Sequence, residues 1–147
     1  MIPTLRPMTP GDHPAALALW QATEGMGLGP ADSAENVTAF LARNPGLSVV
    51  AEEAGRLVGT ALCGQDGRRG FIYHLALAKE FRGAGTGRAL VNWCLEGLRR
   101  QGLTRCHIIV YAHNEEGRRF WAHLGFCERT ELLLCAHDLK PSERPAT

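Results

Sequence analysis

Arg82-Gly83-Ala84-Gly85-Thr86-Gly87-Arg88 is a glycine-rich turn between an apolar segment, residues 71–77, and a long amphipathic segment, residues 85–101. The first segment is apolar on both faces, which is typical of a central strand, and the second has the apolar stripe of a helix. A glycine-rich turn that enters a helix exposes several backbone N–H groups, and the helix dipole adds positive charge there. The glycine-rich turn, residues 82–88, therefore predicts a binding site for an anion such as a pyrophosphate.

Two familiar phosphate-binding motifs do not fit this turn. A P-loop needs a lysine after its second glycine, and the glycine-rich turn has none. The dinucleotide motif G-x-G-x-x-G would need a small residue where Arg88 or Leu90 stands, within a regular alternation of strands and helices. The turn matches the pattern R-x-x-G-x-G instead.

Hydrophobic periodicity predicts the remaining elements on both sides of the turn. We expect further strands at residues 2–8, 47–53, 57–64, 106–111 and 128–136, and further helices at residues 9–23, 32–43 and 114–124. Thr9, with Asp12 three residues later, is typical of a helix start, and Asp32 or Ser33 is expected to cap the second helix. This order predicts an α/β fold with a mixed, mostly antiparallel central sheet flanked by helices.

Length and composition predict a single domain over residues 1–139, followed by a disordered tail at residues 140–147. The chain has 147 residues, of which 45% are hydrophobic and 21% charged, as in one ordinary globular domain. Its net charge is only +1, so it lacks the basic excess of proteins that bind nucleic acid. We therefore expect neither nucleic acid nor a membrane as a partner.

The five cysteines and the N-terminus indicate a reducing compartment. The cysteine count is odd, and no pair has C-x-x-C spacing, so we expect free thiols and no metal site. The N-terminus lacks the apolar region of a signal peptide, and no apolar run approaches the roughly 20 residues that span a bilayer. These features predict a cytoplasmic protein.

Two blocks of the sequence together resemble the GNAT-type N-acetyltransferases. The first is the apolar strand, the R-x-x-G-x-G turn and the helix after it. The second, residues 114–126, is N-E-E-G-R-R-F-W-A-H-L-G-F, which is similar to the family's N-x-x-(small)-x-x-F-Y-x-x-x-G-F helix. The resemblance covers nearly the whole chain and implies a GNAT-like acyl-coenzyme A-binding fold. It also implies an enzyme, monomeric or homodimeric, that transfers acetyl from acetyl-coenzyme A directly to a primary amine of a small molecule, amino acid or peptide.

The same resemblance implies where coenzyme A binds. The pyrophosphate would lie on the amides of the glycine-rich turn, and the pantetheine arm would pair with the strand before it like an added strand. An amide near Leu75 or Ala76 would polarise the thioester carbonyl, and Asn114 would contact the arm from its other side. The residues expected to bind the cofactor are Leu75, Ala76, Leu77, Arg82, Gly83, Ala84, Gly85, Thr86, Gly87, Arg88, Asn114, Phe120 and Trp121.

The general acid is the point at which this chain departs from the family. Family members usually protonate the leaving thiolate with a tyrosine in the second block, where this chain has Trp121. An indole N–H donates a hydrogen bond but delivers no proton at neutral pH. Tyr73, Tyr111 and His113 are possible substitutes, and water is another.

His74 is the candidate general base, because histidine titrates near neutral pH and this one lies in the central strand. Alternation along a strand sends Tyr73 and His74 to opposite faces unless a bulge intervenes. A role in core packing stays open for Tyr73, His74 and Tyr111 alike.

The acceptor amine has weaker sequence signals. In such folds the acceptor pocket lies near the first helices and the turn after the third strand. The candidate substrate-binding residues there are Trp20, Glu24, Asp66 and Arg68, although for any one of the charged side chains a solvated turn is the better interpretation. Two other functions stay open: a non-catalytic acyl-coenzyme A sensor, which the absent tyrosine would suit, and a dimerisation module on the same fold.

Overall fold

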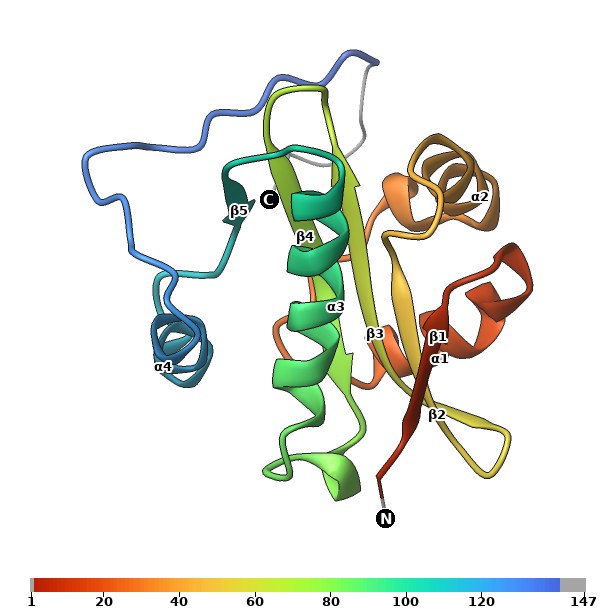
Figure 1. Cartoon of the computed structure of the whole chain (residues 1–147). Coiled ribbons are helices and arrows are strands. Elements are labelled where there is room, and N and C mark those ends of the chain that lie inside the picture. Colours follow the sequence, from red (N-terminus) through yellow and green to blue (C-terminus); the bar gives the residue numbers. More distant parts are fainter. Residues whose placement is uncertain (1, 141–147) are drawn as a thin grey trace. The chain divides into compact units, whose positions relative to one another are not determined.

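The computed structural model describes residues 2–140. The chain divides into two compact units, Met1–Ile109 and Val110–Thr147. The first unit contains a five-stranded sheet in the order β1 to β5 (Figure 1). Its strands are β1 (Thr4–Pro7), β2 (Val49–Glu53), β3 (Arg56–Gln65), β4 (Gly70–Leu77) and β5 (Cys106–Ile108).

Neighbouring strands from β1 to β4 are antiparallel, and β5 alone runs parallel to its neighbour, β4. The predicted mixed and mostly antiparallel sheet is therefore confirmed.

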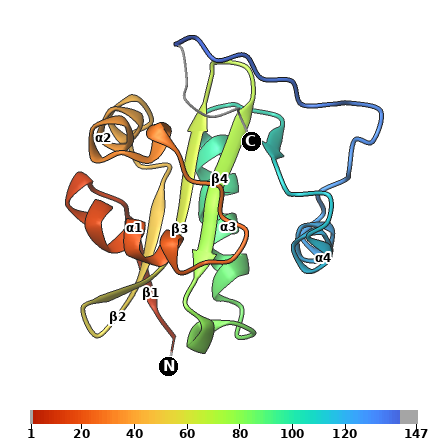
Figure 2. The same ribbon diagram turned by 180° about the vertical axis from the view of Figure 1, so that it is seen from behind.

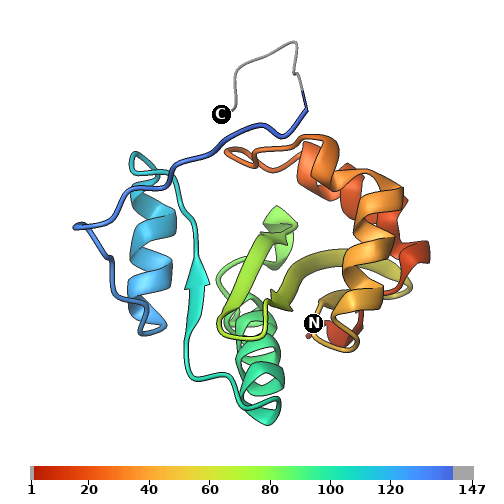
Figure 3. The same ribbon diagram turned by 90° about the horizontal axis from the view of Figure 1, so that it is seen from above.

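Helices cover both faces of this sheet. Helices α1 (His13–Gln21) and α2 (Ala34–Arg43) lie on one face, and α3 (Thr86–Arg100) lies on the other (Figures 1 and 2). Figure 3 shows the same layers along the strands, with the sheet between the two sets of helices. On the α1 and α2 face the core is a cluster of buried residues: Met8, Ala16, Trp20, Val37, Leu41, Val50, Leu62 and Ala76.

The α3 face is packed closely enough to require glycine on the strand beneath it. A Cβ at Gly70 would lie 2.5 Å from the side chain of Leu98 on α3. Gly97 of α3 itself has the same role, since its Cβ would lie 2.7 Å from Leu47. The buried apolar stripe of α3 contains Leu90, Val91 and Cys94, as its sequence periodicity predicts.

Both predicted helix starts are confirmed. The backbone N–H of Thr9 donates to the Asp12 carboxylate at 2.8 Å, and a short 3-10 helix, Pro10–Asp12, leads into α1. Ser33 is the cap of α2, because its hydroxyl accepts from the Asn36 N–H at 3.1 Å. Asp32 ends a second 3-10 helix, Pro30–Asp32, and its carboxylate contacts His74 instead of capping α2.

The second unit contains the predicted helix, α4 (Glu115–His123), but not the predicted strand at residues 128–136. That prediction was wrong, because a strand needs a hydrogen-bonded neighbour and the described part of this unit forms no other strand. Leu132, Leu133 and Leu134 are 60%, 89% and 77% exposed as a result. The expected strand at residues 106–111 is also shorter, since β5 ends at Ile108.

Four further expectations concern the domain organisation, the C-terminal tail, a membrane and a metal site. The single domain over residues 1–139 stays a prediction, and all but the first residue of the expected disordered tail, residues 140–147, lies outside the described residues. Within the described residues, no helix is long and apolar enough to cross a membrane. The same part of the chain contains no group of three or more metal-ligating side chains.

Candidate functional site

The glycine-rich turn has the backbone geometry that an anion site needs. Gly83 and Gly85 have φ angles of +83° and +90°, in the left-handed region that favours glycine. Gly85 is the N-cap of α3 and supplies no side-chain cap, so the first amides of the helix have no side-chain acceptor. These amides at the positive end of the helix dipole can bind an anion.

The residues of the turn differ in their exposure to solvent. Thr86 is buried, at 7% exposed, whereas Arg82, Gly83, Ala84, Gly85 and Arg88 are exposed and Gly87 is half-buried. Arg82 is held in place, since its Nε donates to the Leu77 carbonyl at 2.9 Å. The turn is thus tied to the end of β4, with its backbone open to solvent.

Beyond Ile72, β4 has an unpaired edge. The parallel register between β4 and β5 runs from Gly70 opposite Cys106 to Ile72 opposite Ile108, where β5 ends. The remaining part of β4, residues 73–77, has no strand on that side among the residues described. Leu75, Ala76 and Leu77 lie in this part, which can accept an extended ligand as an added strand.

A β-bulge interrupts β4 at His74. Tyr73 pairs with Leu62 and Ala76 pairs with Thr60, so His74 and Leu75 together face Ala61 alone on β3. His74 has a φ angle of +49°, which is uncommon outside glycine and costs about 1–3 kcal/mol. Strained residues of this kind persist only where the surrounding structure holds them, and they cluster at functional sites.

The bulge turns Tyr73 and His74 to the same face of the sheet, the face that α1 and α2 cover. The His74 ring lies against Trp20 of α1, with centroids 4.7 Å apart. The Tyr73 ring meets Phe40 of α2 edge-on, with centroids 6.3 Å apart. Simple alternation would have separated the two candidate catalytic side chains, and the bulge removes that conflict.

His74 is held at both its backbone and its ring. Thr60 Oγ1 donates to the His74 carbonyl at 2.8 Å and accepts from Trp20 Nε1 at 2.9 Å. The ring is paired through Nε2 with Asp32 Oδ1 at 2.7 Å. The segment that supplies Asp32, between α1 and α2, crosses in front of β4 in Figure 2.

Sequence reasoning missed both of these partners. Asp32 was a candidate helix cap, and an acidic residue just before a helix gives no sign of a contact with a strand residue 42 positions away. Thr60 had no signal at all, because a threonine inside a strand is ordinary.

Tyr73 is a candidate proton donor. The residue is 39% exposed, and its hydroxyl forms no hydrogen bond with any of residues 2–140. Partial burial, and then the negative charge of Asp66, raise the pKa of Tyr73 above its ordinary value. The phenol therefore keeps its proton at neutral pH.

The four candidate acceptor residues lie in different surroundings. Trp20 is completely buried beneath His74, so it belongs to the core and is not exposed to an acceptor molecule. Glu24 lines a surface depression of about 340 Å³, together with Lys79 and Arg82. Asp66 stabilises its own turn, because its carboxylate accepts from the N–H groups of Arg68 and Arg69, both at 2.8 Å.

The turn around Asp66 has an electrostatic consequence. These two backbone hydrogen bonds, from Arg69 first and then Arg68, lower the pKa of Asp66. Asp66 is therefore a charged group at neutral pH, whereas the side chain of Arg68 is exposed and pairs with no acidic group in the described range.

In the second unit, the structure explains the asparagine and the small residue of the motif at residues 114–126. Asn114 is the N-cap of α4, and its side chain accepts from the Gly117 N–H at 2.9 Å. A Cβ at Gly117 would lie 2.5 Å from Asn114 Nδ2, so the motif requires a small residue there. Trp121 is half-buried between Phe120 and Phe126, with centroids 5.2 Å and 5.0 Å away.

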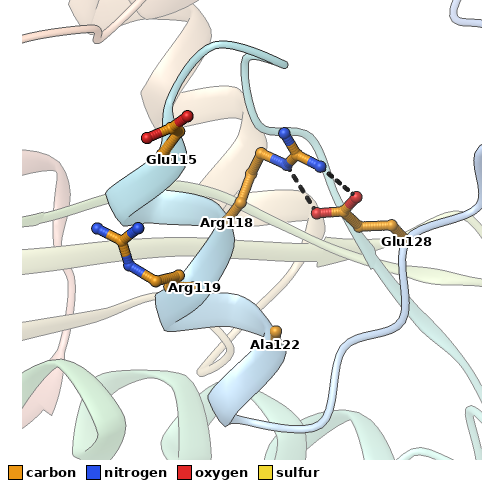
Figure 4. Close-up of a pocket in the computed structure, with 5 residues that line it drawn as sticks. All are labelled: Glu115, Arg118, Arg119, Ala122 and Glu128. Atoms are coloured by element: carbon orange, nitrogen blue, oxygen red, sulfur yellow. Dashed lines mark hydrogen bonds and ion pairs between the residues drawn. The ribbon is translucent and has the colours of Figure 1, made fainter.

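A depression of about 360 Å³ on α4 contains none of the expected site residues. Arg118 bonds to both oxygens of Glu128 at 2.8 Å, and Arg119 points away from this pair (Figure 4). Tyr111 lies outside α4 and stacks on His113, with centroids 5.3 Å apart. A role for Tyr111, Asn114, Phe120 or Trp121 beside coenzyme A stays a prediction.

The likeness to known proteins agrees with this geometry. An acetyltransferase of Photorhabdus laumondii is 32% identical over 120 residues, which cover 82% of this chain and 79% of that protein. The structure of Ard1 from Thermoplasma volcanium matches with a TM-score of 0.76 at 23% identity, covering 86% of this chain and 84% of that one.

A second solved structure, PaiA N-acetyltransferase from Thermoplasma acidophilum in complex with coenzyme A, has a TM-score of 0.75 at 17% identity, covering 86% of this chain and 91% of that one. A sequence model described as "Acetyltransferase (GNAT) family" matches residues 15–126. Together with the glycine-rich turn and the bulged strand, this match shows that the chain belongs to the GNAT acetyltransferase family.

Proposed function

We propose that this protein transfers the acetyl group of acetyl-coenzyme A to a primary amine of a small molecule, an amino acid or a peptide. The observation that supports this best is the β4 bulge, which puts His74 and Tyr73 on one face beside an unpaired strand edge. The glycine-rich turn follows the same strand, so an anion site and a thioester site would lie at one end of the sheet. The coenzyme A complex of PaiA supports coenzyme A as the ligand.

The proposed position of coenzyme A follows from these features. Its pyrophosphate binds the amides of residues 83–88, at the N-terminus of α3. Its pantetheine arm pairs with the free edge of β4 along Leu75 and Leu77. The amide of Leu75 or Ala76 then polarises the thioester carbonyl, as a single-donor oxyanion hole.

The proposed chemistry is a direct transfer. The neutral amine attacks the thioester carbonyl carbon, a C–N bond forms, and the C–S bond breaks with release of the thiolate. His74 accepts the proton that the amine loses. Tyr73 supplies a proton to the thiolate, because it shares a face with His74 and its raised pKa keeps it protonated. Tyr111 and water are the alternative donors.

Glu24, Asp66 and Arg68 would then face the acceptor. A carboxylate such as Glu24 suits a cationic amine, and Arg68 suits a carboxylate or phosphate on the same molecule. We expect the enzyme to work in the cytoplasm as a monomer or homodimer, without a metal ion.

The test is thiol release from acetyl-coenzyme A in the presence of amino acids, polyamines, aminoglycosides and N-terminal peptides. We expect saturable acetyl-coenzyme A binding by calorimetry and turnover with one of these classes. Loss of the base in His74→Ala should lower kcat by roughly 10²–10⁴-fold with little change in coenzyme A affinity. Binding without turnover across the panel would favour the acyl-coenzyme A sensor, and no binding of either coenzyme form would refute the proposal.

A further inference from the structure

We propose that Asp32 is a positioning residue that fixes the tautomer of His74, so that Nδ1 is the nitrogen that accepts the proton of the acceptor amine. The catalytic half of this inference rests on the proposed function. The tautomer itself does not, because it can be measured without a substrate.

The contact between Asp32 and His74 determines which ring nitrogen carries the proton. Asp32 Oδ1 lies 2.7 Å from His74 Nε2, and the two side chains are only 11% and 15% exposed. A carboxylate has acceptor positions only, so Nε2 must donate and therefore bears the hydrogen. In the neutral ring Nδ1 then holds the lone pair that a general base requires.

The carboxylate of Asp32 is itself held from two sides. Its second oxygen, Oδ2, accepts from the Gly29 N–H at 3.0 Å. Its backbone carbonyl is bonded to His13 Nε2 at 2.7 Å. With both ends of the residue fixed, Oδ1 stays directed at the His74 ring.

The second ring nitrogen of His74, Nδ1, shows whether Asp32 positions the ring for catalysis or only attaches its segment to β4. Nδ1 bonds to none of the residues described, yet no buried side-chain nitrogen or oxygen among them lacks a partner. Nδ1 is therefore not fully buried, as the base of an open site must be. A contact that only held the strand to the neighbouring segment would need neither the left-handed φ of His74 nor an unpaired ring nitrogen that is not fully buried.

The neighbourhood of His74 contains few other titratable groups. Asp32 comes from the segment between α1 and α2, His13 reaches Asp32 from α1, and Tyr73 is the residue before His74 in β4. Trp20 and Thr60 complete the contacts and do not titrate at neutral pH. Asp32 is thus the carboxylate that sets the protonated nitrogen.

The decisive variant is Asp32→Asn. Because the Gly29 N–H needs an oxygen, the new amide presents its NH₂ group to His74 Nε2, which must then accept. The ring hydrogen moves to Nδ1 and the base is lost. Asp12→Asn is a matched control, since the Asp12 carboxylate is also 11% exposed and also paired, but with Arg6 and not with His74.

The first measurement is the ¹⁵N NMR spectrum of the histidine rings in the full chain, with His74→Gln for assignment. We expect His74 to carry its hydrogen on Nε2 in the wild type and in Asp12→Asn, and on Nδ1 in Asp32→Asn. An Nδ1–H tautomer in the wild type would overturn the inference. If Asp32→Asn does not fold, the same spectrum is measured for Asp32→Glu, which keeps a carboxylate. We expect the His74 hydrogen to stay on Nε2 in that variant, and a hydrogen on Nδ1 would overturn the inference.

The second measurement is steady-state kinetics with the amine found above. We expect Asp32→Asn to lower kcat by about 10²-fold or more, with the KM for acetyl-coenzyme A unchanged. In a His74→Ala background it should change kcat by no more than about 2-fold, because Asp32 acts through His74. Equal kcat values in Asp32→Asn and Asp12→Asn would overturn the inference. If the tautomers are as expected but no amine is acetylated, the proposed function is refuted and the inference about the tautomer is not.

Discussion

Replacing Thr60 with valine should destabilise this protein strongly although valine has almost the same shape. Thr60 is completely buried, and its hydroxyl accepts from Trp20 Nε1 and donates to the His74 carbonyl. Thr60→Val therefore leaves one buried donor and one acceptor without partners. Each costs roughly 1–3 kcal/mol, so we expect a loss of about 2–6 kcal/mol in the free energy of unfolding.

Thr60→Ser is the matched control for this experiment. It keeps the hydroxyl and removes one buried methyl group, which should cost only about 1 kcal/mol. Urea unfolding, followed by far-UV circular dichroism and tryptophan fluorescence, measures both variants. Because the same hydroxyl holds the bulge, kcat should also fall further in the valine variant than in the serine variant.

A clear result would refute this reasoning. If Thr60→Val were as stable as Thr60→Ser, or more stable, the hydrogen bonds of the Thr60 hydroxyl to Trp20 and to the His74 carbonyl would not be needed for stability. The strained backbone of His74 would then be maintained by Asp32 and by packing alone.

Three further predictions concern other parts of the chain. Gly85→Ala should cost about 1–2 kcal/mol, because φ there is +90°, and should weaken coenzyme A binding measured by calorimetry; unchanged affinity would argue against an anion site on the turn. Hydrogen bonds from Arg6 lower the pKa of Asp12 below its ordinary value of 3.8, so its contribution to stability is present above that pH and is lost as pH falls through the lowered pKa. Urea midpoints between pH 6 and pH 2 should therefore fall less in Asp12→Asn than in the wild type, and parallel curves would contradict this. Cys135 is exposed and should react quickly with a thiol reagent in the native protein, whereas slow reaction would mean that residues 128–136 are paired as a strand.

Features that depend on neighbouring residues were predictable from the sequence. The helix start at Thr9 and the cap at Ser33 use side chains within three positions of the amides they bind. The glycine-rich turn was predictable for the same reason, since left-handed backbone angles at Gly83 and Gly85 are a local requirement. These local signals, with hydrophobic periodicity, were enough to predict the class of fold, and the resemblance of two motif blocks to known sequences indicated the family.

The strand predicted at residues 128–136, which the structure does not form, shows where local signals fail. Its run of leucines suits a strand, but strand formation depends on a partner that its own sequence does not supply. The described part of the second unit offers none, and the leucines are exposed.

By itself, the sequence determined that an apolar strand leads through a glycine-rich turn into a helix, and that His74 and Tyr73 are candidates for catalysis. Only the tertiary structure decided where these two side chains lie and which residues hold them. The bulge depends on the register with β3, and the orientation of His74 depends on Thr60 and Asp32, which are 14 and 42 residues away. Such contacts arise from packing α1 and its following segment over the sheet, and no short window of sequence contains both partners.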